Sequence, residues 1–300
     1  MRLIAVLLAL ALATGAHAQP AEREVPPGAA IDWWKPDNGG PVRYRSDGVH
    51  LMLDSGPDRR EHGARSAALT VAMPGFPRLV VRGTPSGGWD GARVHVGRWR
   101  GQPYVLFQTN TGGAHCCANV QMILPMNGRL RVVEVGTWDG EFLDLPTDVD
   151  GDGNPDFLVR DNQFLYAFGP YAGAAAPPQI WNVIDGRSVD VSTDPRFRRL
   201  FNAALAEDRA LCLAGGEDAN SPCAAFVADA ARIGQHAFEQ AWREMLPHYG
   251  PATGFGFPQG CRARRRDGGC PESQLFDYPD FPRALRPFLE QAGYLPTRAP

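Results

Sequence analysis

Short apolar or alternating segments recur along the first half of the chain, and turn residues separate them. Alternation with a period of two places one face of a strand against a core. The clearest turn is Asn127-Gly128, which joins two apolar segments as a two-residue hairpin loop. Their spacing of about ten residues predicts an antiparallel sheet. The expected strands are Val42–Tyr44, Leu51–Leu53, Ala68–Ala72, Leu79–Val81, Arg93–Trp99, Tyr104–Gln108, Val120–Pro125, Leu130–Val135, Phe157–Val159 and Phe164–Phe168.

After residue 187 apolar residues recur at helical spacing. Asp194-Pro195 combines an N-cap residue with a proline at the first helical position, and Gly215-Gly216 ends that segment. Ser221-Pro222 opens a second helix, which Gly234 is expected to interrupt. A last helix is predicted over residues 280–291.

These patterns predict an α+β protein. Its antiparallel β-rich N-terminal domain is expected to be a propeller-like blade or a sandwich, and a small helical region stapled by disulfides follows. The expected division is a signal peptide over residues 1–18, a Pro/Gly-rich arm over 19–40, the β-rich domain over 41–186 and the helical region over 187–300. Trp33 and Trp34 in the arm are expected to dock onto the folded part.

The first eighteen residues have the pattern of a secretory signal. Arg2 supplies a positive start, Leu3 to Leu12 is an almost unbroken apolar run, and Ala16-His17-Ala18 offers the small residues of a cleavage site. We therefore expect cleavage after Ala18 and a periplasmic or secreted protein. The sequence predicts no transmembrane segment, because no other stretch reaches the ~20 apolar residues that span a bilayer.

Composition fits a folded protein, with 44% hydrophobic and 21% charged residues. The formal net charge of −3 gives no electrostatic basis for binding nucleic acid. The sequence sets no oligomeric state.

Six cysteines in an exported chain are expected to be paired. Local spacing favours Cys212 with Cys223 and Cys261 with Cys270, and each bridge should stabilise the fold by about 2–3 kcal/mol. Adjacent Cys116 and Cys117 then form a vicinal bond, or each reaches a distant cysteine. We favour the vicinal bond, because the other four pair so readily.

Residues 148–156 are the most informative segment of the chain. Carboxylates stand at loop positions 1, 3, 5 and 9, the carbonyl of Asn154 is available at position 7, and Gly153 permits a sharp turn. Such like charges repel by about 1–4 kcal/mol per pair unless a cation lies among them. Ca²⁺ accepts oxygen ligands in a forgiving geometry, which favours calcium. The predicted ligands are Asp148, Asp150, Asp152, Asn154 and Asp156.

The loop differs from an EF-hand, because position 12 is Val159 where a bidentate Glu is expected and a strand follows. The string from Asp148 to Val159, DVDGDGNPDFLV, instead resembles the calcium loops of FG-GAP and VCBS repeats, as in integrin α-subunits. The resemblance covers residues 142–168. It implies a permanently filled structural calcium site in a domain of a kind often used for adhesion. The alternatives are a regulated calcium sensor and a loop that holds no metal. One such loop is too little for a whole propeller.

The segment from Gly112 to Cys117, GGAHCC, resembles a string in uncharacterised exported bacterial proteins, and this implies no activity. His115 with thiolates could bind copper or zinc, or a cysteine beside His115 could act as a nucleophile. An oxidised cysteine pair supplies no thiolate, and no base-and-orienter pattern accompanies the segment. A rigid turn between two strands is therefore the favoured interpretation.

Two further sets of charged residues stand out. Arginines in the loop between Cys261 and Cys270 could bind phosphate, a polyanionic glycan or an acidic protein face, or they could simply be solvated. Asp139, Glu141 and Asp144 could act as acid and base in a cleft, or assist the metal loop. The candidate anion-binding residues are Arg262, Arg264, Arg265 and Arg266.

The common nucleophile, phosphate-loop and zinc-protease motifs do not occur in the sequence. We therefore expect a secreted or periplasmic calcium-binding protein that binds an envelope glycan or protein, and not an enzyme. The alternative is an envelope hydrolase with its site near His115.

Overall fold

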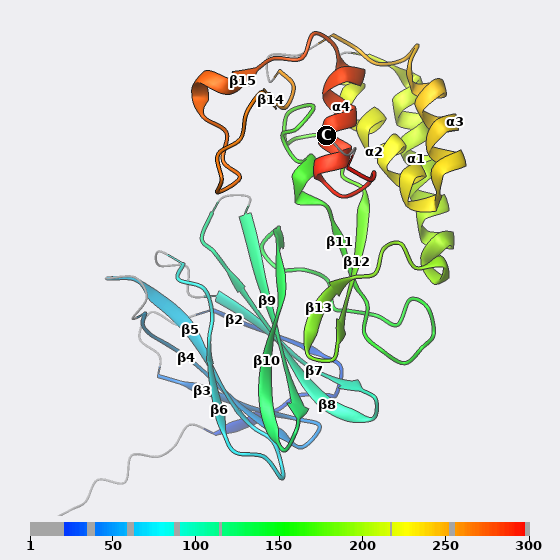
Figure 1. Ribbon diagram of the computed structural model, residues 1–300. Coiled ribbons are helices and arrows are strands. Elements are labelled where there is room, and N and C mark those ends of the chain that lie inside the picture. Colours follow the sequence, from blue (N-terminus) through cyan, green and yellow to red (C-terminus); the bar gives the residue numbers. More distant parts are fainter. Residues whose placement is uncertain are drawn as a thin grey trace, which may run out of the picture.

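A computed structural model describes residues 21–34, 40–58, 63–86, 91–113, 116–216, 218–251 and 256–297. Two β-sheets lie at one end of the molecule and the helices at the other, with a third, smaller sheet between them (Figure 1). The chain is therefore α+β, with a β-rich N-terminal part and helices at the C-terminal end, as the sequence predicts.

The first sheet is antiparallel except at one edge, where β1 runs parallel to β3. Alternating residues of β4 are buried, and Leu51 and Leu53 point into the core. The strands, in sheet order, are β1 (Glu22–Glu24), β3 (Val42–Ser46), β4 (Val49–Pro57), β5 (Arg65–Ala72) and β6 (Leu79–Arg82).

The second sheet contains the longest strands of the protein. Its β9–β10 hairpin turns through Asn127 and Gly128, both at positive φ, which confirms the predicted turn. The strands, in sheet order, are β10 (Arg129–Asp139), β9 (Cys116–Met126), β8 (Gln102–Asn110), β7 (Gly91–Trp99) and β2 (Ala30–Trp34).

The two sheets pack face to face as a sandwich. One apolar cluster contains inward side chains from both sheets, with Leu69 and Val71 on one side and Val94 and Phe107 on the other. Of the two architectures that the sequence allowed, the structure has the sandwich.

The segment expected to be an N-terminal arm contributes strands to both sheets. β2 pairs antiparallel with β7, and β1 pairs with β3. Ile31 and Trp33 are buried in the sandwich core, while Trp34 on the opposite face is half-exposed. The Pro and Gly content of this segment obscured the alternating pattern of residues 30–34 in the sequence. Residues 21–34 belong to the β part, so the arm interpretation is wrong there.

A third sheet covers the outer face of the second. Phe157, Val159 and Val183 pack against outward side chains of β8 and β9 such as Leu106 and Met122. β8 is consequently buried on both faces, which explains the unbroken apolar run Tyr104–Phe107 in its middle. The strands are β11 (Phe157–Arg160), β12 (Pro178–Ile184) and β13 (Arg187–Asp190).

The connection from β11 to β12 is not the strand that its apolar residues suggested. It starts with a 3-10 turn, η1 (Asn162–Phe164), capped by Asp161, whose side chain accepts from the Gln163 amide. Phe164 and Phe168 then insert into the helical core. The apolar pattern of these residues suggested a strand, but the helices are what bury them.

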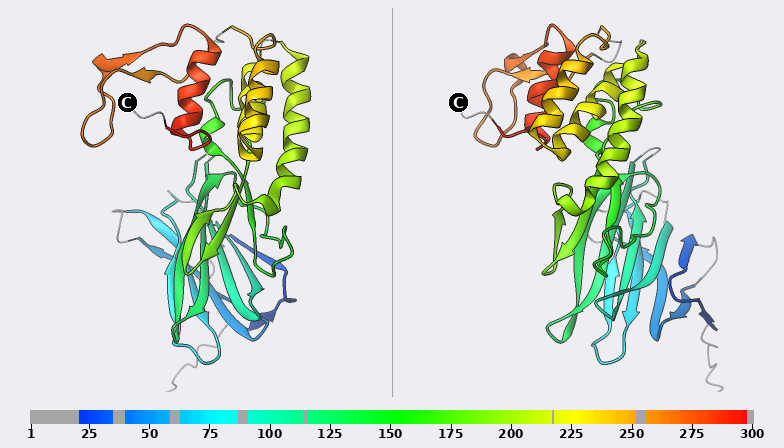
Figure 2. Two further views of the ribbon diagram at one scale, coloured as in Figure 1. Left: turned by 45° about the vertical axis from the view of Figure 1, so that its right-hand side comes forward. Right: turned by 90° about the vertical axis from the view of Figure 1, so that its right-hand side faces the viewer.

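The helices begin and end largely where the sequence predicts. Asp194 caps η2 and Asp280 caps α4, and Gly234 at positive φ separates α2 from α3. The helical elements are η2 (Pro195–Phe197), α1 (Arg198–Ala214), α2 (Asn220–Ile233), α3 (Gln235–Met245), η3 (Glu272–Gln274) and α4 (Phe281–Gln291). Figure 2 shows them packed side by side above the third sheet.

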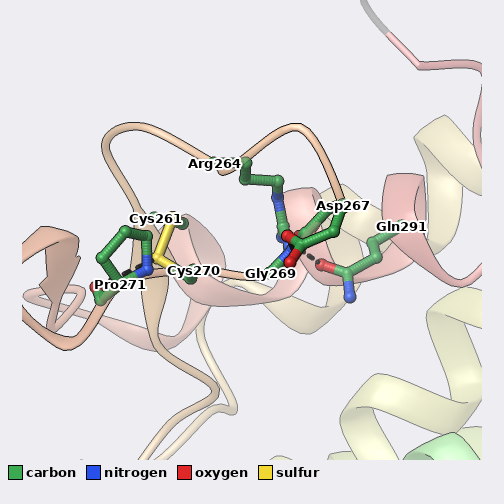
Figure 3. Close-up of a disulfide and its surroundings, with 8 residues drawn as sticks. Cys261, Arg264, Asp267, Gly269, Cys270, Pro271 and Gln291 are labelled. Carbon is green, nitrogen blue, oxygen red and sulfur yellow. Dashed lines mark hydrogen bonds between the residues drawn. A yellow bond between two sulfur atoms is a disulfide. The ribbon is translucent and has the colours of Figure 1, made fainter.

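Two disulfides staple the helical part as predicted. Cys212 and Cys223 are fully buried and join α1 to α2. Cys261 and Cys270 close a loop beside the short ladder of β14 (Gly260–Cys261) and β15 (Leu275–Phe276) (Figure 3). Gly260 is needed in that ladder, because an added Cβ would lie 2.2 Å from the ring of Phe276.

A buried polar chain ties the third sheet to the helices. The Tyr294 hydroxyl donates to Asp161 over 2.9 Å, and the Arg232 guanidinium lies 4.3 Å from the centre of the Tyr294 ring. The same guanidinium donates to Asp190 on β13 over 3.2 Å. Side chains from β13, the cap of η1, α2 and the segment after α4 thus contact one another in the interior.

Candidate functional site

The Asp-rich loop leaves and re-enters a short antiparallel bridge just before β11. Thr147 and Asp156 exchange both backbone hydrogen bonds, at 3.2 and 2.7 Å. The bridge brings the two ends of the loop together and aligns Asp156 with the start of β11. The loop is consequently anchored to the third sheet.

The first carboxylate of the loop organises its turn. Asp148 accepts from the Gly151 amide over 2.8 Å and from the Gly153 amide over 3.0 Å. Both glycines have φ near +80°, where a side chain is strained. These glycines are therefore needed for the loop to curl around its acidic side chains.

Three of the predicted ligands converge. Asp148, Asp150 and Asp156 each present an oxygen, and these oxygens lie within 4.8 Å of one another. Asp156 is fully buried and accepts from the Val149 amide at 2.7 Å and from Asn182 on β12 at 2.9 Å. Burial raises the pKa of Asp156, against those two hydrogen bonds, and the neighbouring charge of Asp150 raises it further.

The other two predicted ligands are arranged differently. The carboxylate of Asp152 accepts from the Asn154 amide over 2.8 Å and is not among the converging oxygens. The side-chain oxygen of Asn154 is buried and has no hydrogen-bond partner. The structure thus assembles three carboxylates and leaves one buried amide oxygen unsatisfied in the same loop.

Arg196, which sequence reasoning missed, lies against this loop. Its Nη1 atom is 2.6 Å from Oδ2 of Asp150 and 3.1 Å from Asp152, while Nη2 is 2.8 Å from Asp194. The side chain of Asp150 is fully buried, and its Oδ2 contacts Arg196 as an ion pair without aligned hydrogen-bond geometry. The guanidinium thus supplies a counter-charge to Asp150 and Asp152 and links the loop to the residues just before α1.

The residues present fit a hard cation in part. Asp148, Asp150 and Asp156 offer hard oxygen ligands at mutual distances that one ion could bridge, and Asn154 carries an oxygen without a donor. Asp152 would have to leave Arg196 to join them. The loop is therefore a candidate calcium centre, and the Arg196 guanidinium beside it competes with the ion for the carboxylates.

A groove of about 730 Å³ opens next to the loop. Its walls come from the end of β10, residues 142–144, β11, the β11–β12 connection and α1. Asp144 precedes the Thr147 bridge and Leu158 follows it, so the loop connects two of these walls. The charged residues lining the groove are Asp139, Asp144, Arg160, Glu207 and Asp208.

Buried amides on β8 hold one wall in place. Gln108 is fully buried and pairs with the backbone of Leu143 in both directions, at 3.1 and 2.7 Å. Asn110 donates to the Glu141 carbonyl over 3.3 Å. Of the acids considered from the sequence, Asp139 and Asp144 line the groove, and Glu141 does not.

His115 and Ala114 lie outside the described residues, as does the side chain of Cys116. Cys117 is disulfide-bonded, and its amide donates to the Thr111 hydroxyl over 2.7 Å. Gly112 has φ +87°, and an added Cβ would lie 2.5 Å from the Ser86 carbonyl. The vicinal bond and the three interpretations of this segment stay predictions.

The arginine loop does not gather its side chains around one point. Arg262 lies 5.5 Å from the centre of the Phe276 ring. Arg264 donates to the Gly268 carbonyl and reaches Gln291 of α4, as Figure 3 shows. Two of the four candidates therefore make contacts within the protein, and anion binding by the loop stays a prediction.

The helical part is similar to a described family. Residues 201–293 match the family called the sll0997 C-terminal domain. The match starts inside α1 and ends just after α4, so it contains both helical disulfides but not the Asp-rich loop.

Two curated proteins are similar over longer stretches. A probable thylakoid lumen protein of Synechocystis sp., sll0997, is 36% identical over 201 residues, which are 65% of this chain and 58% of that protein. The uncharacterized protein y4bJ of Sinorhizobium fredii is 28% identical over 295 residues, which are 95% of this chain and 45% of that protein. The chain spans about half the length of the curated relatives it matches.

No solved structure matches the chain significantly. Within the described ranges, no helix has both the length and the apolar character needed to cross a bilayer.

Proposed function

We propose that this is an exported calcium-binding protein of the cell envelope that acts by binding a partner rather than by catalysis. Export is supported by the two disulfides of the helical part, which persist in oxidising compartments. It is also supported by the similarity to a protein named as a probable thylakoid lumen protein. The signal sequence with cleavage after Ala18 is part of this proposal.

The convergence of Asp148, Asp150 and Asp156 carries the calcium part of the proposal. Three carboxylate oxygens within 4.8 Å repel one another, and a divalent ion is the simplest source of compensation. The unsatisfied oxygen of Asn154 supports a fourth protein ligand. Asp152 completes the set once its contact with Arg196 is released.

In this proposal the ion is structural. It would tie the Thr147 bridge to β11, and to β12 through Asn182, which donates to Asp156. β11 forms a wall of the groove, so the ion would fix the shape of a binding surface without touching the ligand. The proposed partner is an envelope glycan or protein, and the arginine loop is a second surface for a polyanionic one.

Isothermal titration of calcium into metal-free protein tests the proposal. We expect one ion per chain, and we expect Asp150→Asn to abolish binding or to weaken it at least about tenfold, a loss of about 1.4 kcal/mol. Asp185→Asn is the matched control, because it removes the same charge from an exposed turn at a positive φ that asparagine also adopts.

Near-UV circular dichroism of each variant verifies folding. A folded wild-type protein that takes up no calcium would overturn the metal part of the proposal. Equal binding by wild type and Asp150→Asn would place the ion elsewhere and would also overturn it.

A further inference from the structure

Two carboxyl groups meet where α1 and α2 pack beside the groove. Asp208 on α1 lines the groove and is half-buried. Asp229 on α2 is fully buried, and neither of its oxygens has an N–H or O–H donor. The two carboxyls lie close enough to interact directly.

The groups around this pair offset its charge only in part. Glu207, beside Asp208 on α1, adds negative charge. The positive charge of Arg160 on β11 lowers the pKa of both carboxyls, and the charge of Arg232, which is also on α2, lowers the pKa of Asp229. Arg232 is also engaged by Asp190, so its charge is shared.

The pair therefore holds a proton at neutral pH. Burial raises the pKa of Asp229 well above its usual range, and the adjacent Asp208 raises it further. Burial also raises the pKa of Asp208. Two close carboxyls that share one proton form a site that can exchange that proton for another cation.

Helix packing alone does not explain Asp229. Its neighbours Val227, Ala228 and Ala230 are apolar and fully buried, and an apolar residue there would avoid the cost of burying an acid. A buried acid without a donor, placed behind the lining of a groove, is typical of a functional site.

We propose that the groove binds a ligand carrying a primary ammonium group on an apolar chain, with the ammonium held by Asp208 on the groove wall and by the charge of Asp229 behind it. Asp139, Asp144 and Glu207 also line the groove, and their negative charges complement a positively charged ligand. The walls supply apolar surface: Leu158 and Leu211 are 47% and 51% exposed there.

The exchange balances without a covalent step. The ammonium donates to the Asp208 carboxylate and compensates the charge of the buried Asp229 behind it, and the proton that the pair had shared passes to solvent. Binding at neutral pH therefore releases one proton per ligand. Affinity should rise with pH until the free ligand itself loses its proton.

This inference rests on the proposed binding role and names its ligand class. It does not depend on the calcium loop, because Asp208 and Asp229 belong to α1 and α2. A protein that binds calcium but no amine would refute only the ammonium site, and one that binds the amine but no calcium would refute only the metal loop.

Calorimetry with two amine probes tests the site on the folded, calcium-supplemented protein. Spermidine represents a free polyamine. The tripeptide Leu-Lys-Leu, acetylated at its N-terminus and amidated at its C-terminus so that the lysine supplies its only ammonium, represents a lysine side chain in a protein partner. We expect one of them to bind, and which one binds identifies the source of the amine. Titration in two buffers of different ionisation enthalpy should show release of one proton per bound ligand.

Matched controls separate the site from general charge attraction. The peptide with an acetylated lysine should bind at least about tenfold more weakly than its parent, because it lacks the ammonium. Asp208→Asn should weaken binding by a similar factor, while Asp185→Asn in the β12–β13 turn should leave it unchanged. Asp208 is half-exposed, so this variant should fold even if Asp229→Asn does not.

Several results would overturn the inference. These are no binding of either probe up to about 5 mM, binding of the free peptide that its acetylated form matches, and equal binding of a probe by wild type and Asp208→Asn. Binding without proton release would exclude the shared-proton pair as the receptor and would overturn it as well.

Discussion

The sandwich and the helical part of this protein are stabilised in different ways. The cluster between the two large sheets consists of apolar side chains in strict alternation. The helical part also buries Asp229, the Tyr294–Asp161 hydrogen bond and the side chain of Arg232, and it contains both helical disulfides. The sandwich is therefore a frame whose buried polar side chains are mostly uncharged, while the buried acids Asp156, Asp161 and Asp229 lie where the helices meet the third sheet.

This difference indicates where selection for more than stability has acted. Burying charged groups costs free energy that an apolar core avoids, so they persist where specificity or function needs them. Both candidate sites, the Asp-rich loop and the acidic groove, lie at that junction.

The largest expected effect is on the frame. Phe107 is fully buried between the sheets, and Phe107→Ala should lower the free energy of unfolding by about 3–5 kcal/mol through lost contacts and a cavity. Val80→Ala is the control: Val80 is 56% exposed on the edge strand β6, so its change should stay within about 0.5 kcal/mol. Urea unfolding measures both, and similar losses would contradict the assigned core.

The next effect is on the helical staple. Replacing Cys212 and Cys223 together by alanine should cost about 3 kcal/mol, because the unfolded chain regains the entropy of an open loop. The Cys261–Cys270 pair closes a loop of similar length at the surface and is the matched comparison. Both pairs carry the same entropy term, so a larger loss for the buried pair would reflect its packing. A larger loss of unfolding free energy for the Cys261–Cys270 pair would contradict the expectation that the buried pair stabilises the protein more.

Asp229→Asn should stabilise the protein at neutral pH by about 1–3 kcal/mol, because it removes the cost of burying an acid. In wild type the pKa of Asp229 is raised in the folded state. The folded state therefore binds more protons than the unfolded chain above an unfolded pKa of about 3.9, and wild-type stability falls as pH rises.

The advantage of Asp229→Asn should accordingly be small at pH 4 and grow toward pH 8. Urea unfolding at both values checks the sign. A variant that is less stable than wild type at pH 8 would show that the ionised carboxylate is stabilising and would contradict the shared-proton pair.

The smallest expected effect concerns Arg196. Its guanidinium lies 2.6 Å from Asp150 and is half-exposed, so it competes with a cation for that carboxylate. Solvent screens the half-exposed guanidinium and keeps the net worth of the pair small, so Arg196→Ala should raise calcium affinity a few-fold. Calcium titration measures this change. A loss of affinity would mean that Arg196 closes the loop instead of competing for it.

Local signals predicted much of this fold. The Asn127-Gly128 hairpin, the caps Asp194 and Asp280, and the break at Gly234 each depend on one or two adjacent residues. The two helical disulfides followed from short spacing. Segments with their own turn chemistry can be identified without knowing what packs on them.

What the sequence did not predict depends on contacts between distant segments. β2 appeared as an arm because its partner β7 is far along the chain. Arg196 reaches Asp150 from beyond the third sheet, and Asp208 meets Asp229 only because α1 packs on α2. One local signal existed: Asp229 stands in the run CAAFVADAA, a helix apolar on nearly every face, where an acid is out of place.

Hydrogen exchange with and without calcium tests the central proposal most directly. If an ion joins the Asp-rich loop to the junction, calcium should slow amide exchange over residues 147–160 and in β12, while β4 and β5 of the sandwich should exchange as before. Exchange that is unchanged by calcium throughout the chain, or slowed only in the sandwich, would contradict the account.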